Sequence, residues 1–244
     1  MFPHMTAGPI VRYTDIRDQI SRRAINITRL GTGAELFIKG LSKKVLLADN
    51  LSALYTSVTA SGTGSFVGTW IAILAYTLEL YFDFSGYSDM AIGLGQMLGF
   101  NFKLNFDYPY ISTSVSEFWR RWHMSLGSWF RDYIYIPLGG NRVSTGKHIR
   151  NILVVWALTG LWHGASWNFV FWGVYYGLLL LAEKFLLNRF LEKAPSVVRN
   201  LYTMIAVIIG WVFFSQATPA AIGKMLSAMV GFGATCFADR ASLY

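Results

Sequence analysis

Two histidines that stand beside tryptophans are the residues of this chain best suited to proton chemistry. His123 lies in RRWHMSL and His163 in GLWHGAS, whereas His4 and His148 lie in polar segments. Imidazole titrates near neutral pH, and placing it in apolar surroundings costs free energy unless it has a partner or a function. The pattern alone leaves three interpretations of His163 open: an interhelical hydrogen bond, proton transfer, and metal or haem ligation.

Other chemical devices are missing from the sequence. It contains no HExxH, CxxC or His-x-His spacing, so metal or haem ligation has no support. It has no GxSxG nucleophile elbow, and its single cysteine, Cys236, fits a small hydrophobic residue inside a membrane. If the protein is a transferase, direct attack by an acceptor hydroxyl under base catalysis is therefore the simplest chemistry.

Composition indicates that membrane helices must hold these residues. The chain has 244 residues, of which 54% are hydrophobic and 14% charged, and its mean hydropathy is +0.40. Soluble domains usually carry about 25% charged residues. Three windows, 51–78, 151–182 and 201–223, contain no Asp, Glu, Lys or Arg, and each exceeds the roughly 20 residues that cross a bilayer. We expect one multi-helix membrane domain over residues 1–244, with no cleaved signal peptide in the sequence.

Hydrophobic periodicity predicts the individual elements. Residues 1–33 are expected to form an interfacial segment, 34–56 a helix on the cytoplasmic face, and 67–82 a membrane helix. The helix that follows carries Gly95 and Gly99 in the spacing that permits close helix packing. The remaining expected scaffold helices are 201–216 and 220–237.

The longest apolar segment must break near His163. Residues 151–187 would form a helix about 55 Å long, whereas a bilayer core is about 30 Å thick. The expected break is GAS at 164–166, because glycine and serine disfavour the helix interior. A first limb of about 14 residues would place His163 at membrane depth, beside backbone that persists only against protein or a water-filled cavity. The sequence therefore predicts a cavity at His163.

Segment 101–150 is the longest polar stretch, and its net charge of +4 predicts a cytoplasmic location. Ser114 and Glu117 form a capping box at the start of a single helix that is expected to end at Pro137. On such a helix Trp119, Arg120 and His123 share one face. The formal charge of +8 suits anionic lipid and not nucleic acid, because the basic residues are spread between apolar runs and accompany no nucleic-acid-binding module.

Five strings, in order from residue 1 to about 177, resemble the membrane-bound O-acyltransferase (MBOAT) family, in particular its bacterial alginate O-acetyltransferase-like branch. They are FPHMTAGPIVRY, LYFDFSGYSDMAIGLG, FNFKLNFDYPYIS, SEFWRRWHMSLGSWFRDYIYIPLGGNR and GLWHGASWNFVFWG. In the second string we expect Asp83, Ser85 and Asp89 to make structural hydrogen bonds.

The resemblance implies an all-α multi-pass bundle, with re-entrant or interfacial helices around a tunnel between a cytoplasmic acyl donor and an extracytoplasmic acceptor. The catalytic core would cover about 1–187, and 188–244 would add transmembrane helices. Members of the family are about twice as long as this chain, so the bundle is expected to be incomplete at both ends.

The resemblance also implies roles for the two histidines. His163 would be the general base that deprotonates an acceptor hydroxyl, and His123 would position the acyl donor or support its carbonyl. Indole N–H groups or a guanidinium would stabilise the oxyanion. The expected substrate-binding residues are Trp119, Arg120, Trp122, Trp162 and Asn168.

The expected reaction is transfer of an acetyl or other small acyl group from a thioester such as acetyl-CoA to a hydroxyl, for O-acetylation of an exported polysaccharide such as alginate. It would take place at the bacterial inner membrane, with no bound cofactor or metal. The expected partners are extracytoplasmic polysaccharide-acetylation proteins and membrane lipid. The alternative is a non-catalytic membrane scaffold or transporter, whose histidines line a permeation path or bond between helices.

Overall fold

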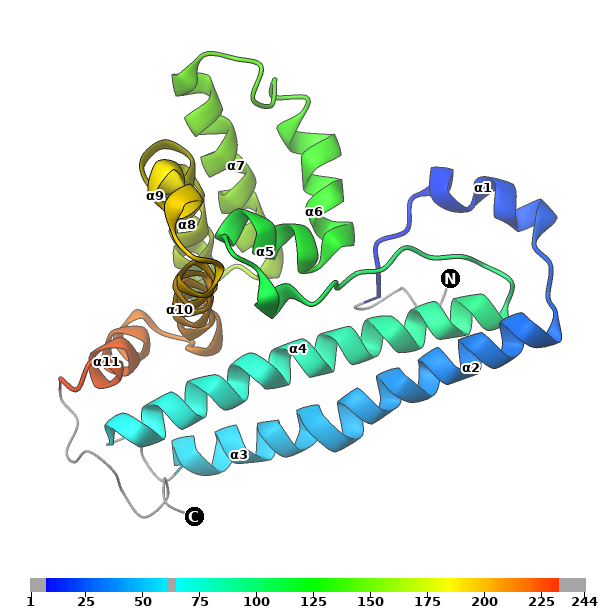
Figure 1. The fold of residues 1–244 in the computed structure, drawn as a ribbon, viewed down its shortest axis with the longest axis horizontal. Helices are drawn as coiled ribbons and strands as arrows, with labels where there is room; N and C mark the ends of the chain where they lie inside the picture. The colour runs from blue at the N-terminus through cyan, green and yellow to red at the C-terminus, as the bar shows by residue number, and fades with distance from the viewer. Residues whose placement is uncertain (1–7, 61–64, 233–244) are drawn as a thin grey trace.

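A computed structural model describes residues 8–60 and 65–232, and every element in these ranges is a helix (Figure 1). His4, Cys236 and the end of the expected helix 220–237 lie outside the described residues. The α-helices are α1 Tyr13–Arg22, α2 Ile27–Ser42, α3 Asp49–Ala60, α4 Phe66–Met97, α5 Val115–Arg121, α6 Met124–Phe130, α7 Thr145–His163, α8 Trp167–Ala182, α9 Asn188–Lys193, α10 Ser196–Ser215 and α11 Pro219–Met229. Wider π-helical turns connect α2 to α3, follow α6, and connect α8 to α9.

A pair of long helical rods forms one side of the molecule. α2 and α3, joined through the π-helical turn Lys43–Ala48, lie along the whole of α4 (Figure 1). The helix predicted at 34–56 is confirmed, but it is longer and begins at Ile27. The predicted end of the next helix at residue 82 is wrong, because α4 has 32 residues in all and continues through Asp83 and Asp89 to Met97.

The carboxylates inside α4 are tolerated because α2 and its π-helical turn supply partners. Lys44 Nζ lies 2.6 Å from Asp83 Oδ1, and Lys43 Nζ donates to Asp89 Oδ2 at 2.6 Å. The structural role predicted for both aspartates is thus confirmed. The hydrogen bond predicted for Ser85 is wrong, since its buried hydroxyl has no partner within the described part of the chain.

Glycines bring the two rods into backbone contact. A Cβ atom added to Gly93 would lie 2.5 Å from the Gly33 carbonyl oxygen, and one added to Gly40 would lie 2.5 Å from that of Gly86. The helix packing predicted for Gly95 and Gly99 is wrong. Gly95 makes room for the Phe102 ring, and Gly99 lies beyond the end of α4 at φ +82°.

The second half of the chain contains a helical hairpin, and the predicted break between its limbs is confirmed. α7 ends at His163, Gly164 is extended, and α8 starts at Trp167. The limbs pack closely, because a Cβ on Gly160 would lie 2.3 Å from the Phe169 carbonyl oxygen. The expected 14-residue first limb is wrong, since α7 begins at Thr145 and has 19 residues, about 28 Å.

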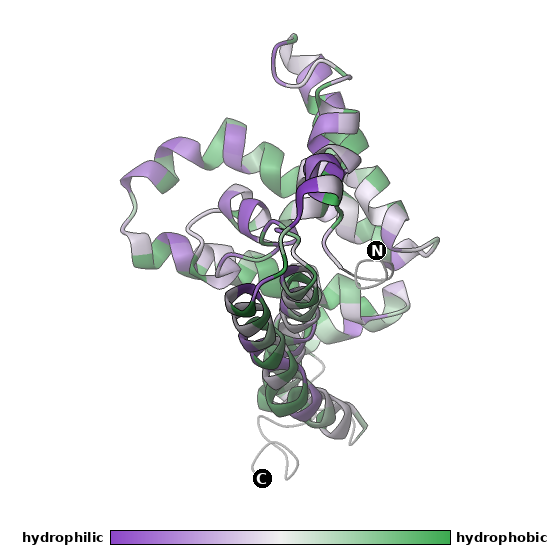
Figure 2. Ribbon diagram, turned by 90° about the vertical axis from the view of Figure 1, so that its right-hand side faces the viewer, coloured by the Kyte–Doolittle hydropathy of each residue, from purple (hydrophilic) through white to green (hydrophobic). Residues whose placement is uncertain are grey.

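Windows without charge do not correspond to single helices. Window 51–78 is divided between α3 and α4, and window 151–182 between α7 and α8. In the described residues, two helices are long and apolar enough to cross a membrane, Trp167–Lys193 and Ser196–Ser215. Hydrophobic side chains also face outward on several elements, and Figure 2 shows apolar turns recurring along helices at the outside of the molecule.

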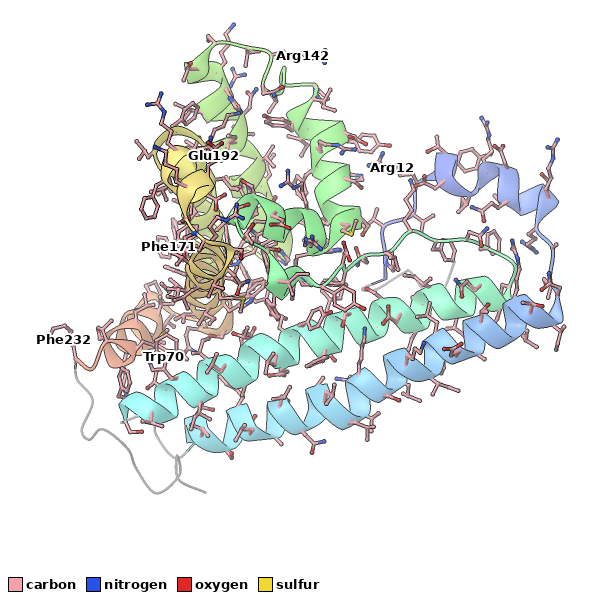
Figure 3. All side chains as sticks on the ribbon, in the orientation of Figure 1. Arg12, Trp70, Arg142, Phe171, Glu192 and Phe232 are labelled. Carbon is pink, nitrogen blue, oxygen red and sulfur yellow. The ribbon has the colours of Figure 1, made fainter. Side chains whose placement is uncertain are left out.

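The buried core lies where α4, α5, α8, α10 and α11 meet. It includes the fully buried Phe118, Trp172 and Trp211. Trp70, near the start of α4, donates its indole N–H to the Met229 carbonyl at 3.0 Å and so attaches α11 to the rods (Figure 3). α10 packs against both α4 and α8.

Candidate active site

Both candidate histidines line one cavity of about 930 Å³. Side chains from α4, α5, α6, α7, α8 and α10 form its wall, and Trp211 and Phe214 of α10 contribute to it from beyond residue 187. The cavity predicted at His163 is confirmed. Residues 80 positions apart in sequence, such as Asp83 and His163, both line this cavity.

His123 stands at a sharp break between two short helices. The single helix expected from Ser114 to Pro137 is wrong: α5 ends at Arg121, and α6 begins at Met124. His123 adopts φ +45° and ψ +52°, a left-handed conformation that costs a residue with a side chain about 1–3 kcal/mol. The face expected to join Trp119, Arg120 and His123 on one continuous helix therefore does not exist.

A neighbouring extended segment holds this break. The Met124 N–H donates to the Asn105 carbonyl at 2.9 Å, and the Asp107 N–H donates to the Arg121 carbonyl at 2.9 Å. The His123 side chain is 6% exposed, packs edge-on against Phe84 at 4.7 Å between ring centroids, and has Nδ1 3.2 Å from Asn105 Oδ1. Its ring is thus fixed by both packing and a polar contact.

His163 is the last residue of α7 and is only partly buried. Its ring meets Trp162, Trp172 and Phe214 edge-on, with centroids 4.9, 5.0 and 5.1 Å away. Within the described residues its ring nitrogens make no hydrogen bond to protein. An aromatic collar thus orients the imidazole, and its nitrogens stay available to a ligand.

Four of the five predicted substrate-binding residues lie on the cavity wall, namely Trp119, Arg120, Trp122 and Trp162. Asn168 does not line the cavity. It is buried near the start of α8, and its Oδ1 has no hydrogen-bond partner in the part of the chain that the structure describes. The break after His163 turns α8 back along α7, which separates Asn168 from the wall.

Sequence reasoning missed Trp172, and it assigned Trp119 to substrate binding without noting the buried N–H group of its indole. Trp119 and Trp172 both line the cavity, and their Nε1 atoms have no hydrogen-bond partner among the described residues. Trp211 Nε1 also lacks a bond of good geometry but faces the Tyr110 hydroxyl. A buried N–H without an acceptor is costly, so the N–H groups of Trp119 and Trp172 would each be stabilised by an acceptor oxygen that came within hydrogen-bonding distance. The signal was available in the string WNFVFWG, which places Trp172 nine residues after His163.

Two glutamates fix the start of α5, the helix that leads to Trp122 and His123. The predicted capping box is confirmed at Ser114, whose hydroxyl accepts from the Glu117 N–H. The Glu117 carboxylate accepts in turn from the N–H and hydroxyl of Thr113, one residue before the cap. Burial opposes the charge of Glu117, but bonds from Thr113 and Arg121 outweigh it and lower the pKa of this carboxyl. Glu183, buried at the end of α8, accepts from the Val115 N–H at 2.5 Å.

Among the described residues, the site contains no cluster of side chains that could ligate a metal ion. Over residues 8–60 and 65–232, no three His, Cys, Asp or Glu side chains gather closely enough to hold an ion. The arrangement instead offers two imidazoles, unpaired N–H donors and an apolar wall, which suits base-assisted attack on a carbonyl.

Residues 1–226 match the family model for MBOAT, the membrane-bound O-acyltransferase family. The chain belongs to this family. It is 44% identical over 242 residues to "Probable alginate O-acetylase AlgI" of Azotobacter vinelandii, which covers 98% of this chain and 48% of that relative. It is 37% identical over 237 residues to the peptidoglycan O-acetyltransferase of Helicobacter pylori, covering 94% and 45% respectively.

A more distant relative is named for the transfer of a different group. The teichoic acid D-alanyltransferase of Streptococcus thermophilus is 30% identical over 217 residues, which cover 79% of this chain and 51% of that relative. The chain spans about half the length of the curated relatives it matches.

Proposed function

We propose that the protein transfers an acetyl group from a thioester to an acceptor hydroxyl, for O-acetylation of an exported polysaccharide, with alginate as the first polymer to test. The observation that carries this proposal is that His123 and His163 line one cavity. Acetyl is preferred to D-alanyl because the chain is 44% identical to an alginate O-acetylase and 30% identical to a D-alanyltransferase.

In the proposed reaction His163 acts as the general base. It takes the proton of the acceptor hydroxyl while the hydroxyl oxygen forms a bond to the acyl carbon. The tetrahedral intermediate then collapses and its C–S bond breaks. The departing thiolate takes up the proton that His163 had removed, which gives the free thiol and returns His163 to its neutral form. The products are an ester and a thiol, with no covalent acyl-enzyme, and such base catalysis contributes about 10²- to 10⁴-fold.

Buried indole N–H groups would receive the charge that develops on the carbonyl oxygen. Trp172 and Trp119 are the candidates, since each Nε1 is buried without a partner within the described ranges and each ring lines the cavity. Preorganised donors in a water-poor site stabilise an oxyanion strongly. Trp122, Trp162 and Arg120 would then contact the substrate chain, because they lie on the same wall.

The proposed membrane arrangement is multi-pass in the bacterial inner membrane. Trp167–Lys193 and Ser196–Ser215 would cross it, and segment 101–150 would face the cytoplasm, where a thioester such as acetyl-CoA is available. Extracytoplasmic partner proteins would carry the acyl group to polymer, and no cofactor would be bound.

The proposal is tested in the full-length gene by His163→Ala, with O-acetyl ester on the secreted polysaccharide as the readout. We expect a loss of at least about 100-fold at unchanged protein level. Trp167→Ala is the control, because Trp167 is 68% exposed and does not line the cavity. Unchanged acetylation in His163→Ala would contradict the proposed role.

A further inference from the structure

Asn105 is a polar residue next to His123 that makes hydrogen bonds through both its side chain and its backbone. It is 1% exposed and lies on the extended segment that follows α4. Its Oδ1 accepts the Ser125 N–H at 3.1 Å and the Ser125 hydroxyl at 2.8 Å, and its Nδ2 donates to Ser88 Oγ at 3.1 Å. Its backbone carbonyl accepts the Met124 N–H, so the residue is fixed at both backbone and side chain.

These bonds determine which amide atom faces the imidazole. A backbone N–H can only donate, so the atom of Asn105 that receives the Ser125 N–H must be the carbonyl oxygen. The same oxygen lies 3.2 Å from His123 Nδ1. An oxygen acceptor requires a hydrogen on Nδ1, because two lone pairs facing each other would repel.

We infer that Asn105 is a positioning residue that holds neutral His123 with its hydrogen on Nδ1, so that Nε2 is a hydrogen-bond acceptor for an O–H or N–H group of the substrate. Nε2 has no protein partner among the described residues, and His123 lines the cavity. The histidine cannot then donate to the acyl carbonyl while it is neutral, which replaces the carbonyl support expected from sequence. The substrate role of Nε2 rests on the proposed function, whereas the position of the proton does not.

The contacts of Asn105 also help to hold the strained backbone at His123. The left-handed conformation at φ +45° is sparsely populated for residues with a side chain, and such strain persists only where surrounding contacts impose it. Asn105 supplies two of those contacts, one to the ring of His123 and one to the following N–H. A single residue thus sets both the direction and the proton of the imidazole.

Nitrogen NMR on the full-length protein in lipid bilayers tests the inference directly. Histidine rings are labelled with ¹⁵N, spectra are taken at pH 8, and the His123 signals are assigned by their loss in His123→Gln. We expect Nδ1 to be protonated and Nε2 unprotonated. A protonated Nε2 beside an unprotonated Nδ1 would overturn the inference, whatever the protein's activity.

Two variants separate the effect of Asn105 from a general loss of structure. In Asn105→Leu we expect both His123 tautomers to be populated and acyl transfer to fall roughly ten- to hundredfold. Asn101→Leu, at an exposed position on the same segment, should keep the wild-type spectrum. An unchanged tautomer in Asn105→Leu would overturn the role of Asn105. Normal tautomer behaviour together with no acyl transfer by the wild-type protein would instead contradict the proposed function alone.

Discussion

Among individual residues, the hydrogen-bond acceptor and the hydrogen-bond donors of the cavity wall belong to different side chains. His163 makes no hydrogen bond within the described residues, and aromatic rings alone orient it. Among the described residues, the indole N–H groups of Trp119 and Trp172 have no hydrogen-bond partner. This division fits acyl transfer, in which a proton leaves the nucleophile while negative charge grows on the carbonyl oxygen.

Replacing Trp172 by Phe removes the indole N–H and keeps an aromatic ring against His163. We predict that kcat falls about 100-fold while KM for the acyl donor changes much less, because an oxyanion donor acts in the transition state. Trp167→Phe, on the exposed start of the same helix, should leave both constants unchanged. An equal and small effect of the two substitutions on kcat would show that the N–H of Trp172 stabilises no oxyanion.

The two histidines could be predicted from sequence because aromatic flanks and apolar surroundings make them unusual. Asn105 could not, since nothing in FNFKLNFDYPYIS distinguishes it from Asn101. Its importance depends on contacts with Ser125 and His123, about 20 residues away, and with Ser88 on α4. The roles predicted for His123 and His163 stay predictions until the variants are measured.

At the element scale, glycine contacts decide how α2 meets α4. Gly33 and Gly31 lie on the same helix. A Cβ added at Gly33 would lie 2.6 Å from the Gly93 carbonyl oxygen, whereas a Cβ added at Gly31 would meet no atom within 4 Å. The surroundings of the two positions therefore predict opposite effects of the same substitution.

We predict that Gly33→Ala lowers the free energy of unfolding by about 1–3 kcal/mol, because the rods must separate. Gly31→Ala should raise it by up to about 1 kcal/mol through better helix propensity. Thermal unfolding of the full-length protein in detergent measures both. Equal shifts of the two melting temperatures would contradict the close contact between α2 and α4.

Helix positions were predictable where local signals are strong, and their ends were not where tertiary contacts override them. The break after His163 follows from GAS, and the capping box at Ser114 marks α5. The uninterrupted α4 depends on lysines of another element that pair with Asp83 and Asp89. The break at His123 depends on Asn105, so periodicity within its own segment predicts one continuous helix there instead.

Across the whole molecule, the ends of the hairpin α7–α8 and of α10 indicate which loops lie on the same side. Lys184 at the end of α8 lies 3.3 Å from His148 near the start of α7, so the Arg142 loop lies at that end (Figure 3). If Trp167–Lys193 and Ser196–Ser215 both cross the membrane, Ala217 lies at the opposite end. The all-helical class was predictable from composition, while the division of charge-free windows between helices was not.

Cysteine labelling in cells tests this arrangement. With Cys236 first replaced by Ser in the full-length protein, we predict that an impermeant thiol reagent modifies Ala217→Cys in intact cells. Arg142→Cys should react only after the membrane is opened, because it lies in the basic segment predicted to be cytoplasmic. Labelling of both cysteines in intact cells would contradict the proposed topology.

Chemical rescue of His163→Ala is the most direct test of a general base at position 163. Purified full-length protein is given a labelled acetyl thioester and a hydroxyl acceptor, and the initial rate is followed as imidazole is added. We predict a rate at least about 100-fold below wild type, which rises with imidazole because the cavity can admit a free base. A His163→Ala rate equal to the wild-type rate would contradict a general base at His163.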